Sequence, residues 1–305
     1  MPVISVVIVN FNGGRRVVDN IRAVAARMPE GEHEVIVVDN ASVDGSRELI
    51  SRELPDVVLL AESENRGYAA GVNRGLEAAA GDVLVVMNPD VVPEPGAIAA
   101  LARAVLDRRD IAILGGAVVD DLGHISANCF RALPRPGDIL REGFFFPPRQ
   151  VGRNAPGAEG DGVVETEVVS GSIMACHRET LRELGPMDEN FFLYREDVEW
   201  CRRARSSGRG VGLVTNARFE HEGGASTGRA EGSAFVARVL SDFHYFCGAE
   251  GVSPAVVKHY WLTVAVFRAA LYRADDLLGL LGGRGNSRRR AAIYRLLRRA
   301  LKPFQ

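Results

Sequence analysis

The chain contains a series of short apolar, largely β-branched runs, each separated from the next by turn residues and a helical pattern. The runs are residues 3–9, 35–38, 57–60, 83–87 and 111–114. Strands that are apolar on both faces and alternate with helices are typical of a parallel sheet that is covered on both sides. The sequence therefore predicts a doubly wound, mostly parallel α/β sheet with helices on both faces.

Charge and cysteine content narrow the class of protein. The net charge is −2 over 305 residues, which argues against general nucleic-acid binding. The four cysteines are scattered, with no CxxC pair, so we expect no disulfide framework or zinc site and a reducing compartment. The chain begins directly with a strand, and no stretch reaches the roughly 18 uncharged apolar residues of a membrane span. We therefore expect a cytoplasmic protein without a signal peptide.

The regular alternation stops after about residue 115. Residues 120–162 hold much of the proline and glycine, and from about residue 230 the pattern is helical to the end. The stretch 120–162 has two interpretations, a mobile excursion that covers a site or an irregular surface insertion. The helical pattern predicts a C-terminal appendage.

Acidic residues follow two of the predicted strands. Asp90, in Asn88-Pro89-Asp90, comes after the run 83–87, and Asp39 ends the run 35–38. Open α/β sheets bind ligands at the carboxyl ends of their strands, and a carboxylate there can hold a divalent cation. The alternatives are that Asn-Pro-Asp is only a turn and that Asp39 and Ser42 only cap the next helix.

The loops after the first and third strands indicate which ligands to expect. Residues 6–15 lack both GxGxxG and GxxxxGK[ST], which argues against NAD, FAD and P-loop nucleotide binding. After the third strand, Arg66 could reach a diphosphate and Gly67 would let the backbone approach a ligand closely. The alternative for this segment is a turn with a solvated arginine.

Several of these segments together resemble the family 2 inverting glycosyltransferases, which have the GT-A fold. The matching segments are residues 6–12, 37–42, 65–73 and 87–90, and the resemblance covers roughly residues 3–225. Asn-Pro-Asp together with residues 191–200 is similar to the rhamnosyltransferase and galactofuranosyltransferase branch. The resemblance implies a catalytic domain at 1–228, with a nucleotide-sugar-binding half at about 1–115 and an acceptor-binding half at 116–228. The helical appendage would occupy 229–305.

The resemblance also implies roles for single residues. Asp197 would be the catalytic base, with Glu196 as an acceptor contact or structural partner; the alternative is that both acids only favour the start of a helix electrostatically. Asp90 and His221 would hold the metal, and Asp39 would bind the pyrimidine N3–H. Contacts to the nucleotide sugar are expected from Val9, Asn10, Asn12, Asp39, Ser42, Asn65, Arg66, Gly67, Asn73 and Asn88. The acceptor pocket would include Gly171, Ser172 and Trp200, although core packing is the favoured role of Trp200.

The metal site departs from the usual DxD pattern of the family. Asn88 stands where a first aspartate often lies, so one carboxylate, Asp90, remains. Metal binding should then depend more on His221 or on the diphosphate of the donor. The expected cofactor is Mg²⁺ or Mn²⁺, and the nitrogen ligand slightly favours Mn²⁺.

The far C-terminus combines apolar and basic residues at helical spacing. Residues 288–301 place leucine and isoleucine on one face and arginine on the other, as in helices that lie on anionic membranes. The alternative is a helix that packs on the catalytic domain or pairs with a second chain. The C-terminal helices therefore have two possible roles, peripheral contact with the inner face of the cell membrane and formation of a homodimer.

The favoured function is that of a metal-dependent inverting transferase. It would move L-rhamnose from dTDP-rhamnose to a saccharide or polyprenyl-linked glycan in cell-envelope polysaccharide synthesis. The alternatives are a UDP-sugar-dependent galactofuranosyl-, GlcNAc- or other hexosyltransferase, a nucleotidyltransferase, and a catalytically silent sugar-binding domain. A nucleotidyltransferase would need a Gly-rich basic loop, which residues 10–15 imitate poorly, and a silent domain would have lost the acids at positions 90 and 197.

Overall fold

The computed structural model describes residues 3–29, 33–138, 162–221 and 231–278. Its contacts divide the chain into two compact units. The first unit consists of Met1–Leu133, Gln150–Phe192 and Glu196–Ser226, and the second of Pro134–Arg149, Leu193–Arg195 and Thr227–Gln305. The short tripeptide Leu193–Arg195 thus belongs to the second unit although both of its chain neighbours belong to the first.

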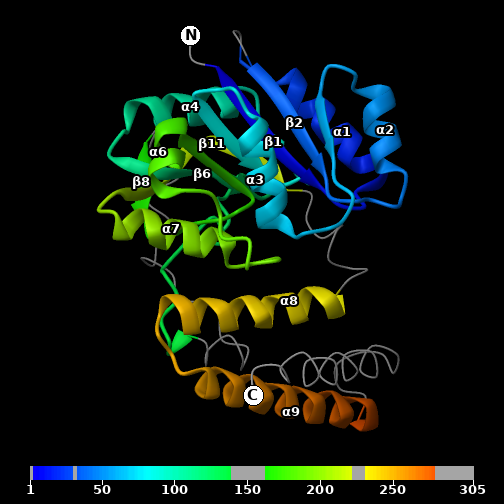
Figure 1. The fold of residues 1–305 in the computed structure, drawn as a ribbon, viewed down its shortest axis with the longest axis vertical. Helices are drawn as coiled ribbons and strands as arrows, with labels where there is room; N and C mark the ends of the chain where they lie inside the picture. The colour runs from blue at the N-terminus through cyan, green and yellow to red at the C-terminus, as the bar shows by residue number, and fades with distance from the viewer. Residues whose placement is uncertain (1–2, 30–32, 139–161, 222–230, 279–305) are drawn as a thin grey trace. The chain divides into compact units, whose positions relative to one another are not determined.

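Over the described residues, the first unit is built on a nine-stranded sheet in the order β3-β2-β1-β4-β10-β6-β11-β5, with β8 beside β11 (Figure 1). A second, two-stranded sheet joins β7 and β9. The strands are β1 Ile4–Asn10, β2 His33–Asp39, β3 Val58–Ala61, β4 Val83–Met87, β5 Val91–Pro93, β6 Ile111–Val119, β7 Phe130–Arg131, β8 Val163–Thr166, β9 Val168–Val169, β10 Ile173–His177 and β11 Gly210–His221.

The pairing of the strands confirms the predicted doubly wound, mostly parallel sheet. β1 pairs in parallel with β2 and β4, β2 with β3, and β6 with β11. β10 runs antiparallel between β4 and β6, and β5 and β8 run antiparallel to β11. The sequence pattern did not predict β10, because only one of its five residues, Ile173, is β-branched.

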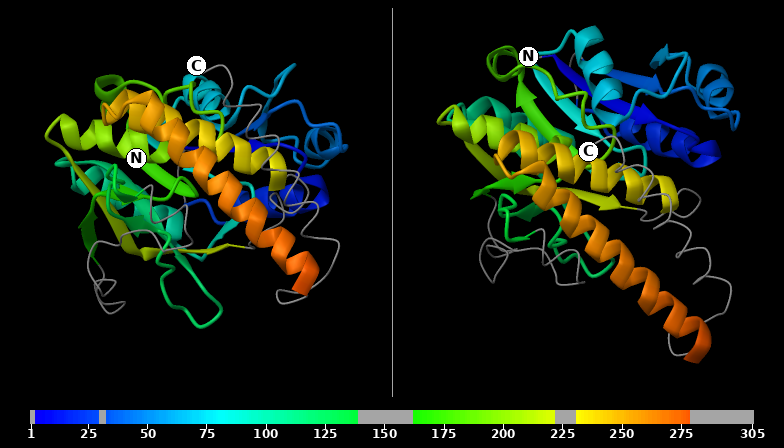
Figure 2. Two further views of the ribbon diagram at one scale, coloured as in Figure 1. Left: turned by 90° about the horizontal axis from the view of Figure 1, so that it is seen from below. Right: turned by 60° about the horizontal axis from the view of Figure 1, so that its bottom comes forward.

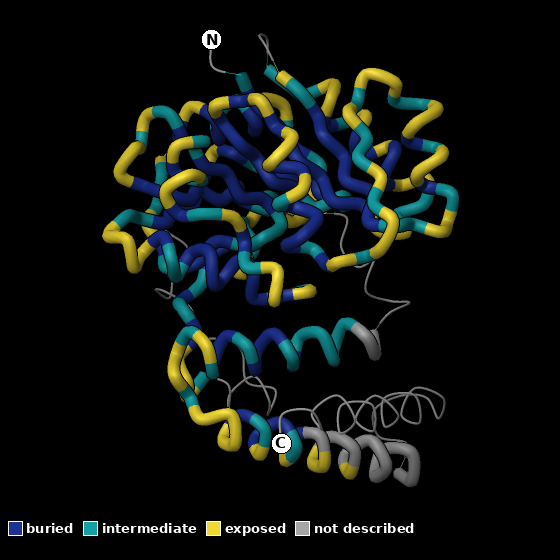
Figure 3. The backbone as a smooth tube through the Cα atoms, viewed as in Figure 1, coloured by how far each residue is buried: buried dark blue, intermediate teal, exposed yellow. Residues whose placement is uncertain are grey.

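Helices pack on both faces of the sheet. They are α1 Gly14–Ala26, α2 Ser46–Glu53, α3 Tyr68–Ala78, α4 Ala97–Asp107, α6 Arg178–Leu184 and α7 Glu196–Ser206. The side chains of α1 and α4 share one core with Ile4, Val6 and Ile8 of β1. Because side chains alternate along a strand, Val7 and Val9 point to the opposite face, where they meet α3. Figure 3 shows the strands as the buried centre of this unit.

Helix α3 lies close to β1 because glycine occupies the contact positions. A Cβ placed on Gly75 would lie 2.3 Å from Val7 Cγ1 and 3.2 Å from Val38 Cγ2. We therefore expect Gly75→Val to reduce the free energy of unfolding by about 1–3 kcal/mol, because overpacking forces buried β-branched neighbours to move. Urea unfolding measures this change. Gly137→Ala, whose added Cβ would meet nothing within 4 Å, is the control and should change stability little.

The second unit contains α8 Glu231–His244, a π-helical turn at Tyr245–Ala249 and the long helix α9 Pro254–Leu278 (Figure 2). The rings of Phe235 and Trp261 pack edge to face with centroids 6.0 Å apart, which joins α8 to α9. Within the described ranges, no helix has the length and apolar character needed to span a membrane. The predicted amphipathic segment 288–301 lies outside the described residues.

The sheet brings the predicted site segments to one edge. Asn10 and Asp39, the last residues of β1 and β2, are paired across the two strands. Met87, the last residue of β4, lies opposite Ile173, the first residue of the antiparallel β10. The start of β10 therefore lies at the same edge as the carboxyl ends of the parallel strands, which is where open α/β sheets bind ligands.

Candidate active site

One end of this edge is a network of polar side chains around Asn10. The buried Asn10 amide donates hydrogen bonds to Asp39 Oδ2 at 2.7 Å, Ser46 Oγ at 3.0 Å and Ser42 Oγ at 3.2 Å. Ser42 Oγ also accepts a hydrogen bond from the backbone N–H of Asn12 at 2.9 Å. The structure thus brings together four of the predicted nucleotide-sugar residues, at positions 10, 12, 39 and 42.

The structure also tests the alternative that Asp39 and Ser42 only cap the helix that follows them. Asp39 Oδ1 accepts the backbone N–H of Ser42 within its own loop. The start of α2 is instead stabilised by Asp44, whose Oδ1 accepts both the N–H and the hydroxyl of Ser46. Asp39 is fully buried and uses both oxygens within this network. Because an ionised carboxylate has about four acceptor positions, it can still accept a further donor.

The loop between β3 and α3 packs against the segment that leads to α7. Gly67 has a φ of +96°, and a Cβ there would lie 2.4 Å from the carbonyl oxygen of Phe192. The next residue, Tyr68, donates its backbone N–H to the same oxygen at 2.7 Å. Glycine at position 67 is therefore needed for close approach to another part of the chain.

Asp90 and His221, which the resemblance implies as a metal pair, lie side by side, and their metal binding stays a prediction. His221 lies opposite Val91 in the pairing of β11 with β5, and His221 Nε2 is 3.4 Å from Asp90 Oδ1. The Asp90 carboxylate raises the pKa of His221, although partial burial opposes this shift. No cluster of three or more His, Cys, Asp or Glu side chains suited to a metal occurs among the described residues.

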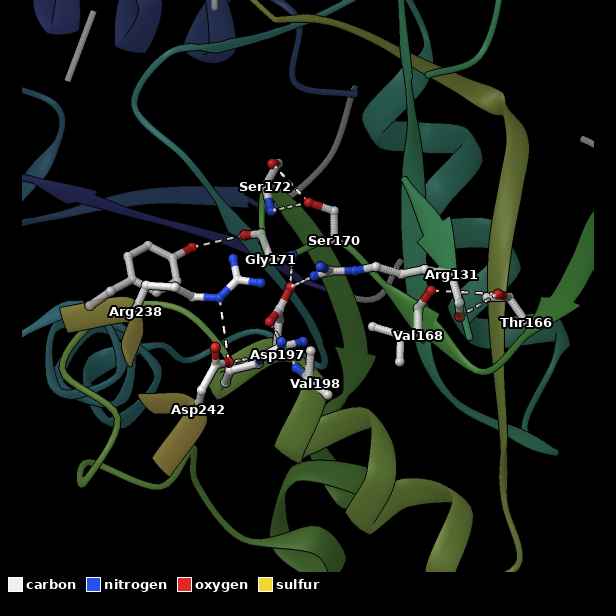
Figure 4. Close-up of polar contacts among 12 residues, drawn as sticks. Arg131, Thr166, Val168, Ser170, Gly171, Ser172, Asp197, Val198, Arg238 and Asp242 are labelled. Atoms are coloured by element: carbon white, nitrogen blue, oxygen red, sulfur yellow. Dashed lines mark hydrogen bonds and ion pairs between the residues drawn. The ribbon is translucent and has the colours of Figure 1, made fainter. Parts of the chain in front are cut away.

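Asp197 lies in the first turn of α7 and is held from three directions (Figure 4). Its Oδ2 accepts hydrogen bonds from Arg131 Nη2 at 2.7 Å and from the Gly171 N–H at 3.1 Å. Its Oδ1 accepts the N–H of Val198 at 2.8 Å. The side chain is 9% exposed, so its orientation is tightly defined while a small part of it remains accessible.

Tyr68 lies next to Gly171, the residue whose N–H binds Asp197. Its hydroxyl donates a hydrogen bond to the Gly171 carbonyl at 3.0 Å. Burial raises the pKa of Tyr68 well above its ordinary value, and the charges of Glu196, Asp197 and Asp90 raise it further. Tyr68 and Asp197 therefore bind the carbonyl and the N–H of the same residue, Gly171.

Comparison with known proteins identifies the family of the chain. Residues 5–132 match the family model described as glycosyl transferase family 2. An N-acetylglucosaminyl-diphospho-decaprenol L-rhamnosyltransferase of Mycobacterium tuberculosis is 31% identical over 79% of this chain and 83% of its own length. The chain belongs to glycosyl transferase family 2. Glycosyltransferase AglE of Haloferax volcanii is a further relative of this glycosyltransferase, 24% identical over 68% of this chain and 63% of its own length.

Solved structures agree with the GT-A fold of this glycosyltransferase. The structure of GalNAc-T7 with UDP, GalNAc and Mn²⁺ aligns with a TM-score of 0.60 and 16% identity, over 83% of this chain and 52% of that chain. A mannosyltransferase from Pyrobaculum calidifontis in complex with GDP-Man and Mn²⁺ aligns with a TM-score of 0.57 and 19% identity, over 98% of this chain and 86% of that chain. At these identities the likeness is one of fold.

Three of the residues predicted to bind a ligand contact other residues of the chain in this structure. Arg66 forms an exposed ion pair with Glu189 at 2.6 Å. The Asn73 amide NH₂ donates hydrogen bonds to the Met187 carbonyl and to Glu189 Oε1, and the Asn73 amide oxygen accepts the Met187 N–H. Trp200 is 1% exposed and donates its indole N–H to the Gly185 carbonyl, so its ring is part of the core. Diphosphate binding by Arg66 and nucleotide binding by Asn73 stay predictions.

The remaining predicted residues lie along the same edge. Asn88 donates its backbone N–H to the Ser172 carbonyl at 2.9 Å, next to Gly171. Asn65 Oδ1 accepts the Gly67 N–H within the loop, and Val9 lies near Gly71 of α3. Gly171 packs against Asp197, with 3.2 Å between a Cβ placed on the glycine and Asp197 Cβ, so only a small residue fits beside the predicted base.

Arg131 is a site residue that the sequence analysis did not identify. It comes from β7, 66 positions before its partner, and no local motif marks it. We expect Arg131→Met to lower kcat about 10- to 100-fold with little change in the donor KM, because the bond that orients Asp197 is lost. Steady-state kinetics with Arg131→Lys as the charge-retaining variant measure this, and an unchanged kcat in Arg131→Met would contradict an orienting role.

Proposed function

We propose that this glycosyltransferase transfers a deoxyhexose, L-rhamnose, from dTDP-rhamnose to a polyprenyl-diphosphate-linked sugar, with inversion. The observation that carries the proposal is the geometry at the ligand-binding edge of the sheet, where Asp197 accepts the Gly171 N–H at 3.1 Å and Asp90 lies 3.4 Å from His221. Support for the sugar comes from the Mycobacterium tuberculosis relative, whose name specifies L-rhamnosyl transfer to N-acetylglucosaminyl-diphospho-decaprenol.

The nucleotide would bind at the end of β1 and β2. Asp39 supplies an acceptor for the N3–H of a pyrimidine, and the surrounding amide and hydroxyl groups hold its carboxylate in place. Thymine and uracil present the same N3–H, so this contact favours a pyrimidine without choosing between them. UDP-sugars therefore remain the alternative donors.

A divalent cation fits the pair Asp90 and His221. Asp90 Oδ1 is buried and accepts no hydrogen bond from the described residues, and it faces an imidazole nitrogen 3.4 Å away. One carboxylate and one imidazole leave coordination positions for diphosphate oxygens. When bound, the cation would stabilise the negative charge that develops on the leaving diphosphate.

Asp197 would act as the general base for the acceptor hydroxyl. Its hydrogen bonds from Arg131 and the Gly171 N–H hold the carboxylate in one orientation, as a general base needs if it is to reach the acceptor hydroxyl. The acceptor sugar would bind beside Gly171, whose N–H donates to this carboxylate. Attack from the side opposite the diphosphate gives inversion in a single displacement.

A donor panel tests the proposed substrate. The protein is incubated with Mn²⁺, a polyprenyl-diphosphate-linked GlcNAc and either dTDP-rhamnose, UDP-galactofuranose or UDP-GlcNAc, and nucleoside diphosphate release is measured. We expect release from dTDP-rhamnose at least tenfold faster than from either UDP-sugar. A preference for a UDP-sugar would replace the proposed donor, and the absence of release from all three would contradict the function.

A further inference from the structure

The tripeptide Leu193–Arg195 directly precedes the helix that carries Asp197, yet its contacts group it with the second unit. Tyr194 and Arg195 both have left-handed backbone conformations, with φ of 70° and 71°. Residues with a Cβ rarely adopt this conformation, and two in succession persist only where the surrounding structure holds them. The contacts of the tripeptide within its own unit provide that hold.

The strongest of these contacts is a buried ion pair. Arg195 Nε lies 2.5 Å from Asp242 Oδ1, and the two side chains are 2% and 1% exposed. The Arg195 guanidinium also lies over the ring of Phe246, 5.9 Å from its centroid. A charge pair removed from water in this way is directional and costly to break, because either partner alone would be a buried, uncompensated charge.

Helix α8 contacts the other two residues of the tripeptide as well. Ser241 Oγ donates a hydrogen bond to the Leu193 carbonyl at 2.9 Å. Arg238 Nε is 3.4 Å from Asp242 Oδ1 (Figure 4). The Arg238 guanidinium also lies over the ring of Tyr194, 5.7 Å from its centroid. One turn of α8 thus fixes the tripeptide through its backbone, its aromatic ring and its charge.

We propose that Arg195 and Asp242 are positioning residues for the base, because their ion pair fixes the backbone two residues before Asp197. The proposal rests on the proposed role of Asp197. A single residue, Glu196, separates Arg195 from Asp197, so a change in the backbone conformation at Arg195 passes along the chain to the first turn of α7. General-base catalysis is sensitive to this placement, since a shift of about 1 Å can lower the rate 10²-fold.

The test uses the full chain with Asp242→Asn, which removes the charge and keeps the shape of the side chain. Hydrogen exchange is followed for residues 196–200, which include the Val198 N–H bonded to Asp197 Oδ1. We expect at least tenfold faster exchange there, with wild-type exchange in β1, β2 and β4. Kinetics should show kcat lowered at least tenfold and the donor KM within twofold of wild type.

The control is Asp110→Asn, which removes an exposed ion pair with Arg108 in the first unit and should leave exchange at 196–200 and kcat unchanged. Unchanged exchange at 196–200 in Asp242→Asn would overturn the positioning role even if no donor were turned over, so this result is independent of the proposed function. Faster exchange with an unchanged kcat would overturn it as well.

Ser241→Ala covers the case in which Asp242→Asn does not fold. It removes only the hydrogen bond to the Leu193 carbonyl and leaves every charge in place. We expect exchange at 196–200 to rise at least threefold while α8 keeps wild-type protection. If α8 exchanges fully in Asp242→Asn and Ser241→Ala leaves residues 196–200 unchanged, the pair stabilises the helical unit alone and the proposal is wrong.

Discussion

Asp197→Asn is expected to lower kcat for glycosyl transfer by about 10²–10⁴-fold while donor affinity stays within about twofold. An amide has the shape of the carboxylate and can still accept the hydrogen bonds of Arg131 and Gly171 through its oxygen. It cannot take up the proton of the acceptor hydroxyl. Turnover by nucleoside diphosphate release and donor affinity by calorimetry measure the two quantities separately.

Glu196→Gln is the matched comparison, because Glu196 is the neighbouring acid on α7 and, counted over the whole residue, both acids are 6% exposed. We expect a smaller loss of kcat in this variant, since Asp197 contacts Gly171 beside the proposed acceptor pocket. A larger loss in Glu196→Gln than in Asp197→Asn would exchange the roles of the two acids. A comparable loss of donor affinity in Asp197→Asn would move that residue to the metal or donor site.

Asp90→Asn is expected to lower kcat/KM by about 10²–10³-fold, equivalent to about 3–4 kcal/mol of transition-state stabilisation. In this variant positions 88 and 90 both carry neutral amides, and His221 is the remaining proposed metal ligand. We expect the Mn²⁺ concentration needed for half-maximal activity to rise and the stabilisation by dTDP with Mn²⁺ in thermal unfolding to fall.

Glu220→Gln provides the control for Asp90→Asn, since Glu220 is an exposed acid next to His221 on the same strand. Its Mn²⁺ dependence should equal that of the wild type. Asn88→Asp, which restores the usual pair of acids, should lower the Mn²⁺ requirement. If Asp90→Asn kept the wild-type Mn²⁺ dependence, Asp90 would have no part in metal binding.

The fold was predictable from sequence where local patterns decide it. The uniformly apolar runs of β1, β2 and β4 predicted the parallel centre of the sheet, because only strands covered on both faces can be apolar throughout. The adjacent acids Glu196 and Asp197 indicated a helix start, and α7 begins at Glu196. By contrast, β5 and β10 are short and weakly patterned, and their pairing depends on partners distant in the chain.

In the candidate site, too, some residues were predictable from the sequence and others depend on contacts between distant parts of the chain. Asp39 and Asp90 follow from strand ends, which are local features, and Asp197 follows from the family resemblance. Arg131 lies 66 residues before Asp197 and Asp242 lies 47 residues after Arg195, so only tertiary structure reveals these pairs. For Gly67, the sequence predicted that another group would approach the backbone closely, and a ligand was the expected group. In the structure the group that approaches Gly67 is the Phe192 carbonyl.

The central claim is that Asp197 and the metal pair act on opposite sides of one sugar in a single displacement. The anomeric configuration of the product, determined by NMR from one round of transfer, tests it most directly. We predict a product whose configuration at the anomeric carbon is inverted relative to the donor. Retention of the donor configuration would require two displacements or a different geometry of attack, and would contradict the proposed roles of Asp197, Asp90 and His221.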